Sequence, residues 1–158
     1  MIELITHIIC LSILSISLIA CGSSKDIAKS TSGLTDYGSP NVDQIILSDG
    51  TFKITEYSND STYGYSEQNP IMVGSKGGGP TNERRFLNSL MGSNGEPITF
   101  SRLGSCCHFS TKNGQFGDVG LLDKYEVAHR GLDKAIILYI NMYDSDILKI
   151  PVGFKRKQ

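Results

Sequence analysis

The sequence predicts an α+β domain, in which one short helix packs on a mainly antiparallel sheet of five to seven strands. Two observations carry this prediction. Short apolar runs with a period of two recur from residue 45 to the C terminus, separated by turns rich in Gly, Asn and Asp. Only residues 81–91 have apolar side chains at helical spacing. Strands and helices do not alternate, as they would in a chain that builds a parallel sheet.

The first expected element is a β-hairpin over residues 45–57. An Asp-Gly pair at its centre is a strong turn signal. In its second arm Phe52 and Ile54 alternate with polar residues, so one face of that arm is predicted to be buried. A third, short strand is expected at residues 70–73.

The single helix is expected to begin at Thr81 or Asn82, either of which can cap it, and to end at Gly92. Glu83 would then lie in the first turn, where the helix dipole favours a negative charge. The residues that share the apolar face are Phe86, Leu87, Leu90 and Met91.

Further strands are predicted at residues 98–109 and 121–129, and the strongest at residues 134–143. Both faces of the last of these are apolar or aromatic, so we expect it in the middle of the sheet. A closing segment at residues 147–154 is expected at an edge, because Pro151 cannot donate a backbone hydrogen bond.

The N-terminal apolar run ends at a cysteine. Residues 8–20 contain no charge and are shorter than the ~20 residues of a membrane span, but they have the length of the apolar part of a signal peptide. Leu18-Ile19-Ala20-Cys21 resembles the lipobox of bacterial lipoproteins, where the chain is cut before a cysteine that receives lipid. The first residues lack the usual Lys or Arg, so an uncleaved anchor helix is the alternative.

This resemblance divides the chain into a signal peptide at residues 1–20, a lipidated cysteine with a flexible tether at residues 21–41, and one globular α+β domain at residues 42–158. The tether is rich in Ser, Gly and Thr and cannot bury a core of its own. The 138 residues that would remain after cleavage are enough for one domain with a core.

The lipobox resemblance also implies a place in the cell envelope, with the membrane bound through the lipid on Cys21. Several acyl chains on one cysteine anchor a protein stably. Gly22 rather than Asp follows the cysteine, which in a Gram-negative host favours the outer membrane, facing the periplasm. An envelope protein is the partner class that this location offers. The net charge of −1 argues against nucleic acid as a partner.

The adjacent cysteines Cys106 and Cys107, followed by His108, are the one chemically suggestive cluster. They could pack separately, form a vicinal disulfide with redox activity, or bind a soft metal together with the histidine. Alternating side chains in a strand favour separate packing and disfavour a shared metal. We assign no metal site.

A Gly-rich loop precedes the helix, and Gly77, Gly78 and Gly79 with Arg84 and Arg85 could bind an anion there. The alternative is a flexible connection. The P-loop pattern is absent, as are the HExxH and Gly-x-Ser-x-Gly motifs, so the sequence indicates no cofactor and no catalytic residues.

Residues 63–154 resemble a family of small envelope lipoproteins of unknown activity. The matching stretches are residues 69–74, 78–87, 102–107 and 121–127. Some members are labelled 2-dehydro-3-deoxyphosphooctonate aldolase, an enzyme that resembles a (β/α)₈ barrel of roughly 250 residues. A domain of this length with one helix cannot form such a barrel, and the resemblance supplies no catalytic residues.

These features together predict a lipid-anchored envelope protein whose domain binds a ligand or supports an assembly. The alternative is an envelope redox protein, or another enzyme, that acts through Cys106 and Cys107.

Overall fold

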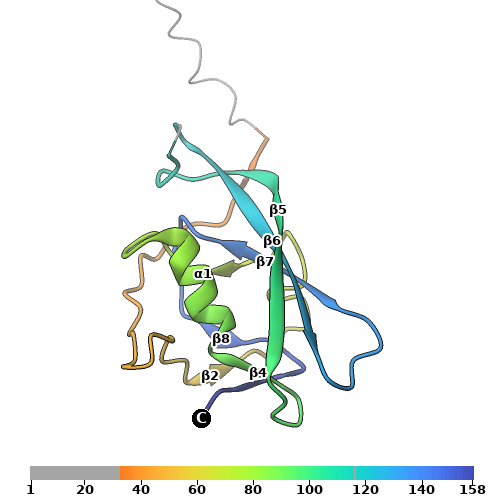
Figure 1. Cartoon of the computed structure of the whole chain (residues 1–158). Coiled ribbons are helices and arrows are strands. Elements are labelled where there is room, and N and C mark those ends of the chain that lie inside the picture. Colours follow the sequence, from red (N-terminus) through yellow and green to blue (C-terminus); the bar gives the residue numbers. More distant parts are fainter. Residues whose placement is uncertain (1–32, 116) are drawn as a thin grey trace, which may run out of the picture.

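The computed structural model describes residues 33–115 and 117–158, so the expected signal peptide and Cys21 lie outside the described residues. One helix and nine strands make up this part of the chain. Figure 1 shows a long, twisted hairpin of two strands along one side, with the helix packed beside it and the shorter strands below. Within these residues no helix is both long and apolar enough to span a bilayer.

The main sheet has five strands in the order β1-β5-β6-β7-β3. Three of them, β5 (Ile98–Ser110), β6 (Val119–His129) and β7 (Ile136–Asn141), are antiparallel neighbours. The two outer strands, β1 (Thr35–Asp36) and β3 (Ile71–Met72), run parallel to the strands they join.

The sheet-dominated α+β fold with one short helix is therefore confirmed, but the expectation of a mainly antiparallel sheet is wrong, because the main sheet is mixed. Both parallel strands are two residues long and come from distant parts of the chain. The period of a strand shows which side chains share a face and carries no information about the direction of its partner.

Two small sheets complete the fold. Strand β2 (Glu56–Tyr57) pairs with β8 (Lys149–Ile150) in parallel, and β4 (Leu90–Gly92) pairs with β9 (Phe154–Arg156) in antiparallel. The expected closing segment thus leaves the main sheet.

The expected strand at residues 134–143 is interior, because β7 lies between β6 and β3. The expected first hairpin is reduced to a bridge between Ile46 and Phe52 around its turn.

Helix α1 (Gly79–Leu87) begins and ends earlier than predicted. Gly78 precedes its first turn, and Pro80 fits there because its missing N–H needs no partner. Leu90 and Met91, which were assigned to the helix, belong to β4 instead. The apolar spacing continues past the helix because Leu90, in β4, is also buried.

The core lies between α1, the main sheet and the strand-like segment at residues 51–57. Its fully buried members include Phe86 and Leu87 from the helix and Leu138 and Ile140 from β7. Phe52 and Ile54 join it, as their alternation predicted. The core therefore ties α1 to both flanking layers.

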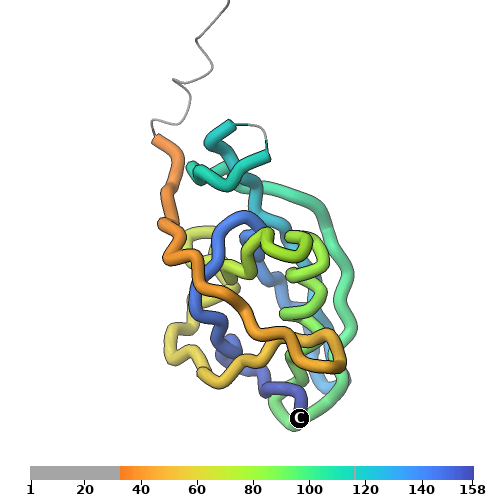
Figure 2. Tube along the Cα trace, turned by 90° about the vertical axis from the view of Figure 1, so that its left-hand side faces the viewer, coloured from red at the N-terminus to blue at the C-terminus, as the bar shows by residue number. Residues whose placement is uncertain are grey.

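Residues 33–41, which were expected to be part of a flexible tether, lie along the domain. Thr35 and Asp36 pair with Phe109 and Ser110, and the Tyr37 ring packs on Phe109 with centroids 5.1 Å apart. Figure 2 shows this segment, in orange, running down the left side of the molecule from its upper end. The domain therefore includes residues 33–41, and its first described residue, Gly33, lies nine positions before the expected boundary at residue 42.

We expect Leu138→Ala to destabilise the domain by about 2–5 kcal/mol, because it leaves a cavity in the core. Leu103→Ala is the matched control, since the same atoms are removed from a side chain that is 53% exposed, against 0% for Leu138. Urea denaturation followed by circular dichroism measures both changes. Equal losses in the two variants would contradict this description of the core.

Candidate functional site

Cys106 and Cys107 are joined by a disulfide in the structure. The pairing of β5 with β6 explains how neighbouring strand residues can meet. Cys106 pairs with Leu122 and His108 with Leu121, so Cys107 is an extra residue in a β-bulge. Its φ of 56° lies in the left-handed region. The bulge interrupts the side-chain alternation that favoured separate packing.

Neither cysteine lies in the core, since both are half-buried. His108 is exposed and pairs with Leu121. His129 pairs with Ile98 at the other end of the β5–β6 hairpin, so the two histidines are not brought together. In residues 33–115 and 117–158, no three Cys, His, Asp or Glu side chains are grouped as metal ligands.

Next to the disulfide, three polar side chains form a cluster that we call the Arg102 cluster: Arg102, Ser105 and Asp123. Arg102 donates two hydrogen bonds to the Asp123 carboxylate, at 2.6 and 2.8 Å, and Ser105 Oγ donates a third at 2.6 Å. Asp123 is 2% exposed, so the guanidinium shields a buried charge from the solvent side. The disulfide and this ion pair thus lie on the same stretch of β5.

Glu83 of α1 reaches the sheet beneath this cluster. Its side chain is fully buried, and Tyr125 Oη donates to Glu83 Oε2 at 2.9 Å. Glu83 Oε1 is buried without a hydrogen-bond partner among the described residues. Burial above all, and then the charge of Asp123, raise the pKa of Glu83 to about 8. Glu83 is therefore largely protonated at neutral pH.

The prediction that Glu83 lies in the first turn of the helix, where the dipole favours its negative charge, is wrong. The helix begins at Gly79, which places Glu83 one turn further in. A signal was present in the sequence, because Glu83 lies three and four residues before Phe86 and Leu87 and so shares their apolar face. A polar residue at an apolar position of a helix indicates a buried partner, here Tyr125.

The Gly-rich loop before α1 is held by its own side chains. Asn82 Nδ2 donates to the carbonyls of Gly74 at 2.8 Å and Lys76 at 2.9 Å. Arg85 donates to Asn82 Oδ1 at 2.7 Å, and more weakly to the carbonyl of Gly77 at 3.4 Å. Arg85 thus fixes the loop.

The other residues of the expected anion site are also accounted for. Gly78 N–H donates to the Ser75 carbonyl, and Gly79 packs against Met142. Arg84 is exposed and donates to Thr81 within the helix. This geometry lends no support to an anion site formed by Gly77, Gly78, Gly79, Arg84 and Arg85.

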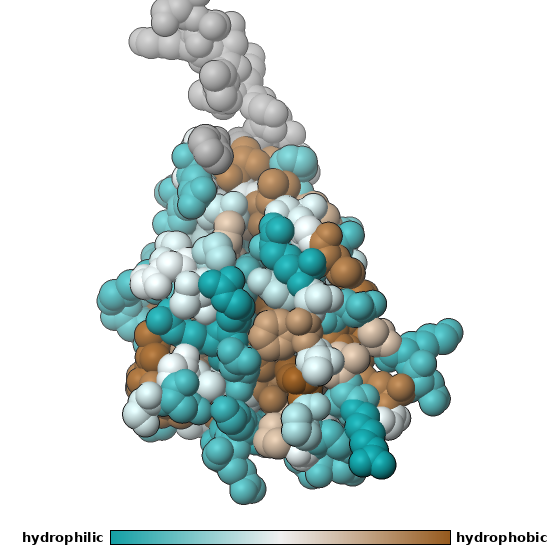
Figure 3. Space-filling view, in the orientation of Figure 1, coloured by the Kyte–Doolittle hydropathy of each residue, from teal (hydrophilic) through white to brown (hydrophobic). Residues whose placement is uncertain are grey.

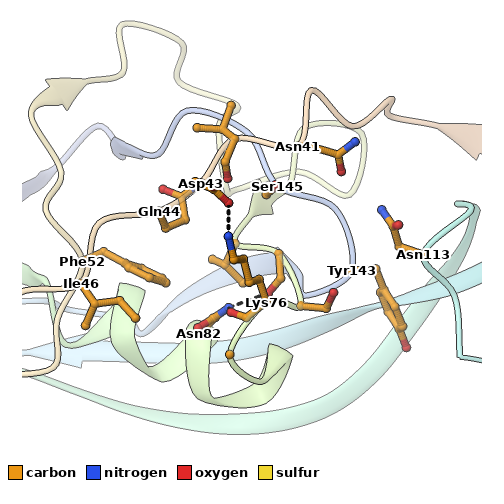
Figure 4. Close-up of a pocket in the computed structure, with 15 residues that line it drawn as sticks. Asn41, Asp43, Gln44, Ile46, Phe52, Lys76, Asn82, Asn113, Tyr143 and Ser145 are labelled. Carbon is orange, nitrogen blue, oxygen red and sulfur yellow. Dashed lines mark hydrogen bonds and ion pairs between the residues drawn. The ribbon is translucent and has the colours of Figure 1, made fainter.

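The same loop forms one wall of a cleft of about 440 Å³, which we call the loop cleft. The opposite wall is the N-terminal segment at residues 41–46. Asn113 and Tyr143 lie at one end, and Ser145 lies near the middle (Figure 4). Lys76 and Asp43 form an ion pair of 2.8 Å between the two walls, which Figure 4 shows across the middle of the cleft. Its volume is within the range of small-molecule sites, about 300–1,000 Å³.

The two ends of the loop cleft differ in chemistry. Ile46 and Phe52 lie at one end with Gln44 beside them, and Asn41, Asn113 and Tyr143 lie at the other (Figure 4). Asn41 and Asn113 also line a second hollow of about 450 Å³, so the polar end continues into a groove toward β1. Sequence reasoning missed this cleft, because its walls are irregular segments far apart in the chain.

Comparison with known proteins gives no relative from which a function could be transferred. No protein-family model matches the chain, no curated protein matches its sequence, and no solved structure matches its fold.

We expect the free energy of unfolding to fall as the pH rises from about 5 to 8. Folded Glu83 keeps its proton up to about pH 8, whereas the unfolded chain releases it near pH 4.5, so higher pH favours the unfolded state. The contribution of this one group is at most about 1.4 kcal/mol per pH unit. Urea denaturation at several pH values measures it.

Glu83→Gln is the control, because glutamine has a similar shape and stays uncharged at every pH. The variant should lose this part of the pH dependence while keeping the same circular dichroism spectrum. Equal slopes for the two proteins would show that Glu83 does not titrate in this range.

Proposed function

We propose that this protein is a lipid-anchored component of the cell envelope whose domain is a binding module. The loop cleft carries the binding half of the proposal, since both of its walls are held in place before any ligand arrives. Gln44 Nε2 donates to the Asp146 carbonyl at 2.7 Å and fixes the N-terminal wall, and Asn82 fixes the loop wall. Preformed walls reduce the entropy lost on binding.

The lipobox-like residues 18–21 support the anchoring half. The first described residue, Gly33, lies at the end of the molecule opposite the C terminus (Figure 1). About twelve residues would then join the domain to a lipid on Cys21, which corresponds to a mean span of about 20 Å for a flexible chain. Such a tether would hold the domain close to the membrane surface and leave the cleft open to the surrounding compartment. In a Gram-negative host we place the protein at the outer membrane, facing the periplasm.

We expect Cys21→Ser to move the protein from the membrane to the soluble fraction or to leave it as the uncut precursor. The intact mass of the wild-type protein extracted in detergent should match residues 21–158 plus acyl groups. A membrane-bound protein that retains Met1 would contradict cleavage and support an uncleaved anchor.

A redox role for Cys106 and Cys107 is the second candidate, and the position of the disulfide favours it. Both cysteines are half-buried on a solvent-facing strand, within reach of a partner. A disulfide between neighbours encloses almost no chain, so the usual stabilisation from constraining the unfolded state is nearly absent. Reduction by a dithiol partner would give two thiols here and a disulfide in the partner.

Thiol alkylation under denaturing conditions tests the state of this pair. Protein taken directly from membranes should take up two labels on Cys106 and Cys107 only after reduction. If the wild type and a Cys106→Ser, Cys107→Ser double variant support growth equally under thiol stress, the redox role is contradicted. Uptake of two labels without reduction would show free thiols.

A further inference from the structure

We propose that the loop cleft binds a neutral saccharide that carries an N-acetyl group. This inference deepens the proposed function, because it names the ligand of the same cleft. It depends on three properties of the cleft: fixed uncharged hydrogen-bonding groups at one end, apolar surface at the other, and no unbalanced charge between them.

The polar end presents groups that match sugar hydroxyls. Asn113 Nδ2 is held by Asp144 Oδ1 at 2.8 Å, which leaves the amide oxygen of Asn113 as an acceptor. Asn41 Oδ1 accepts from Ser39 Oγ at 2.9 Å, which leaves the amide nitrogen of Asn41 as a donor. A sugar hydroxyl both donates and accepts, so it can accept from the amide nitrogen of Asn41 or donate to the amide oxygen of Asn113. Tyr143 lines the same end of the cleft, where its ring packs on Phe109 with centroids 5.9 Å apart.

The apolar end explains the N-acetyl group. Ile46 lines the cleft and is 47% exposed, whereas Phe52 beside it is 2% exposed, so Ile46 is the apolar side chain that a ligand would contact. Figure 3 shows a surface of mixed polarity, with an apolar patch at the lower left, where Figure 1 draws the N-terminal segment in orange. A plain sugar offers only hydroxyls to such a surface. An acetamide methyl would instead remove apolar area from water, and its amide could bond with the polar groups alongside.

Charge argues against an anionic ligand. Asp43 and Lys76 neutralise each other across the middle of the cleft. The groove that continues from the polar end is lined by two exposed carboxylates, Asp36 and Asp118, against one exposed ammonium, Lys112. The excess of negative charge disfavours a phosphate or a carboxylate there.

The backbone of the cleft argues against an extended peptide. A peptide usually binds by adding a strand to an open sheet edge. In the loop wall, however, Val73 is already bridged to Ser145, and its N–H donates to the Asn141 carbonyl at 2.9 Å. Few backbone N–H and C=O groups therefore remain in the loop wall to pair with an added peptide strand.

Saturation-transfer NMR on the ligand tests the proposal with the full protein, extracted from membranes in a detergent that has no sugar headgroup. The probes are N,N′-diacetylchitobiose, cellobiose as the same disaccharide type without acetamides, and trialanine as a peptide. We expect transfer to diacetylchitobiose, strongest at the acetamide methyl groups, and weaker binding of cellobiose. Co-sedimentation with insoluble peptidoglycan then separates a wall polymer, which pellets the protein, from a soluble saccharide, which does not.

Two variants connect binding to the cleft. Asn41→Gly removes the amide while tolerating the φ of 53° at this position, and should weaken diacetylchitobiose binding about fivefold, as the loss of one hydrogen bond does. Ile46→Ser should reduce diacetylchitobiose binding to that of cellobiose. Leu47→Ser is the matched control, because Leu47 is 44% exposed but does not line this cleft, and should change nothing.

Transfer to trialanine without transfer to either saccharide would overturn the saccharide assignment and leave a binding module with a peptide ligand. Transfer to none of the three probes would also overturn it. Equal effects of Ile46→Ser and Leu47→Ser would place any binding elsewhere. Anchoring is read separately, from the mass and the fractionation of the Cys21 variant.

Discussion

The hydrogen bond between Tyr125 of β6 and the buried carboxyl of Glu83 determines how α1 sits on the sheet. Apolar packing would bring the helix to the sheet, but a buried carboxyl has few acceptable positions, since it must keep both a hydrogen bond and its proton. The same helix carries Asn82 and Arg85, which hold the Gly-rich loop. Asn82 and Arg85 lie within one helical turn of Glu83. The position that Glu83 takes in the core therefore also sets the position of the loop that forms one wall of the cleft.

The other wall depends on long-range pairing. The N-terminal segment is fastened at Tyr37, which packs on Phe109 and donates to the carbonyl of Glu67, and again at Gln44. Between these points Asn41 adopts a left-handed conformation, and its side chain reaches the mouth of the cleft. The N-terminal segment that leads into the domain therefore also forms one wall of the loop cleft.

The sequence predicted those features that depend on local pattern: the half-buried arm at Phe52 and Ile54, the interior strand β7 and a single helix. It could not predict features set by distant partners. Thr35 and Asp36 are polar, and only the end of β5 makes them a strand. The bulge at Cys107 arises from the register between β5 and β6, and the side-chain pattern of β5 alone does not reveal how that strand pairs with its neighbour. Glu83 is the intermediate case, because its spacing from Phe86 was visible although its partner was not.

Most of β5 lies at an open edge of the main sheet, since among the described residues β1 pairs only with Phe109 and Ser110. An uninterrupted open edge is a template for another copy of the chain. Bulges at Leu103 and Cys107 break this template twice, and Cys107 of the second bulge is bonded to Cys106. The bulged edge is therefore a poor match for the straight edge of a second copy, which disfavours edge-to-edge pairing.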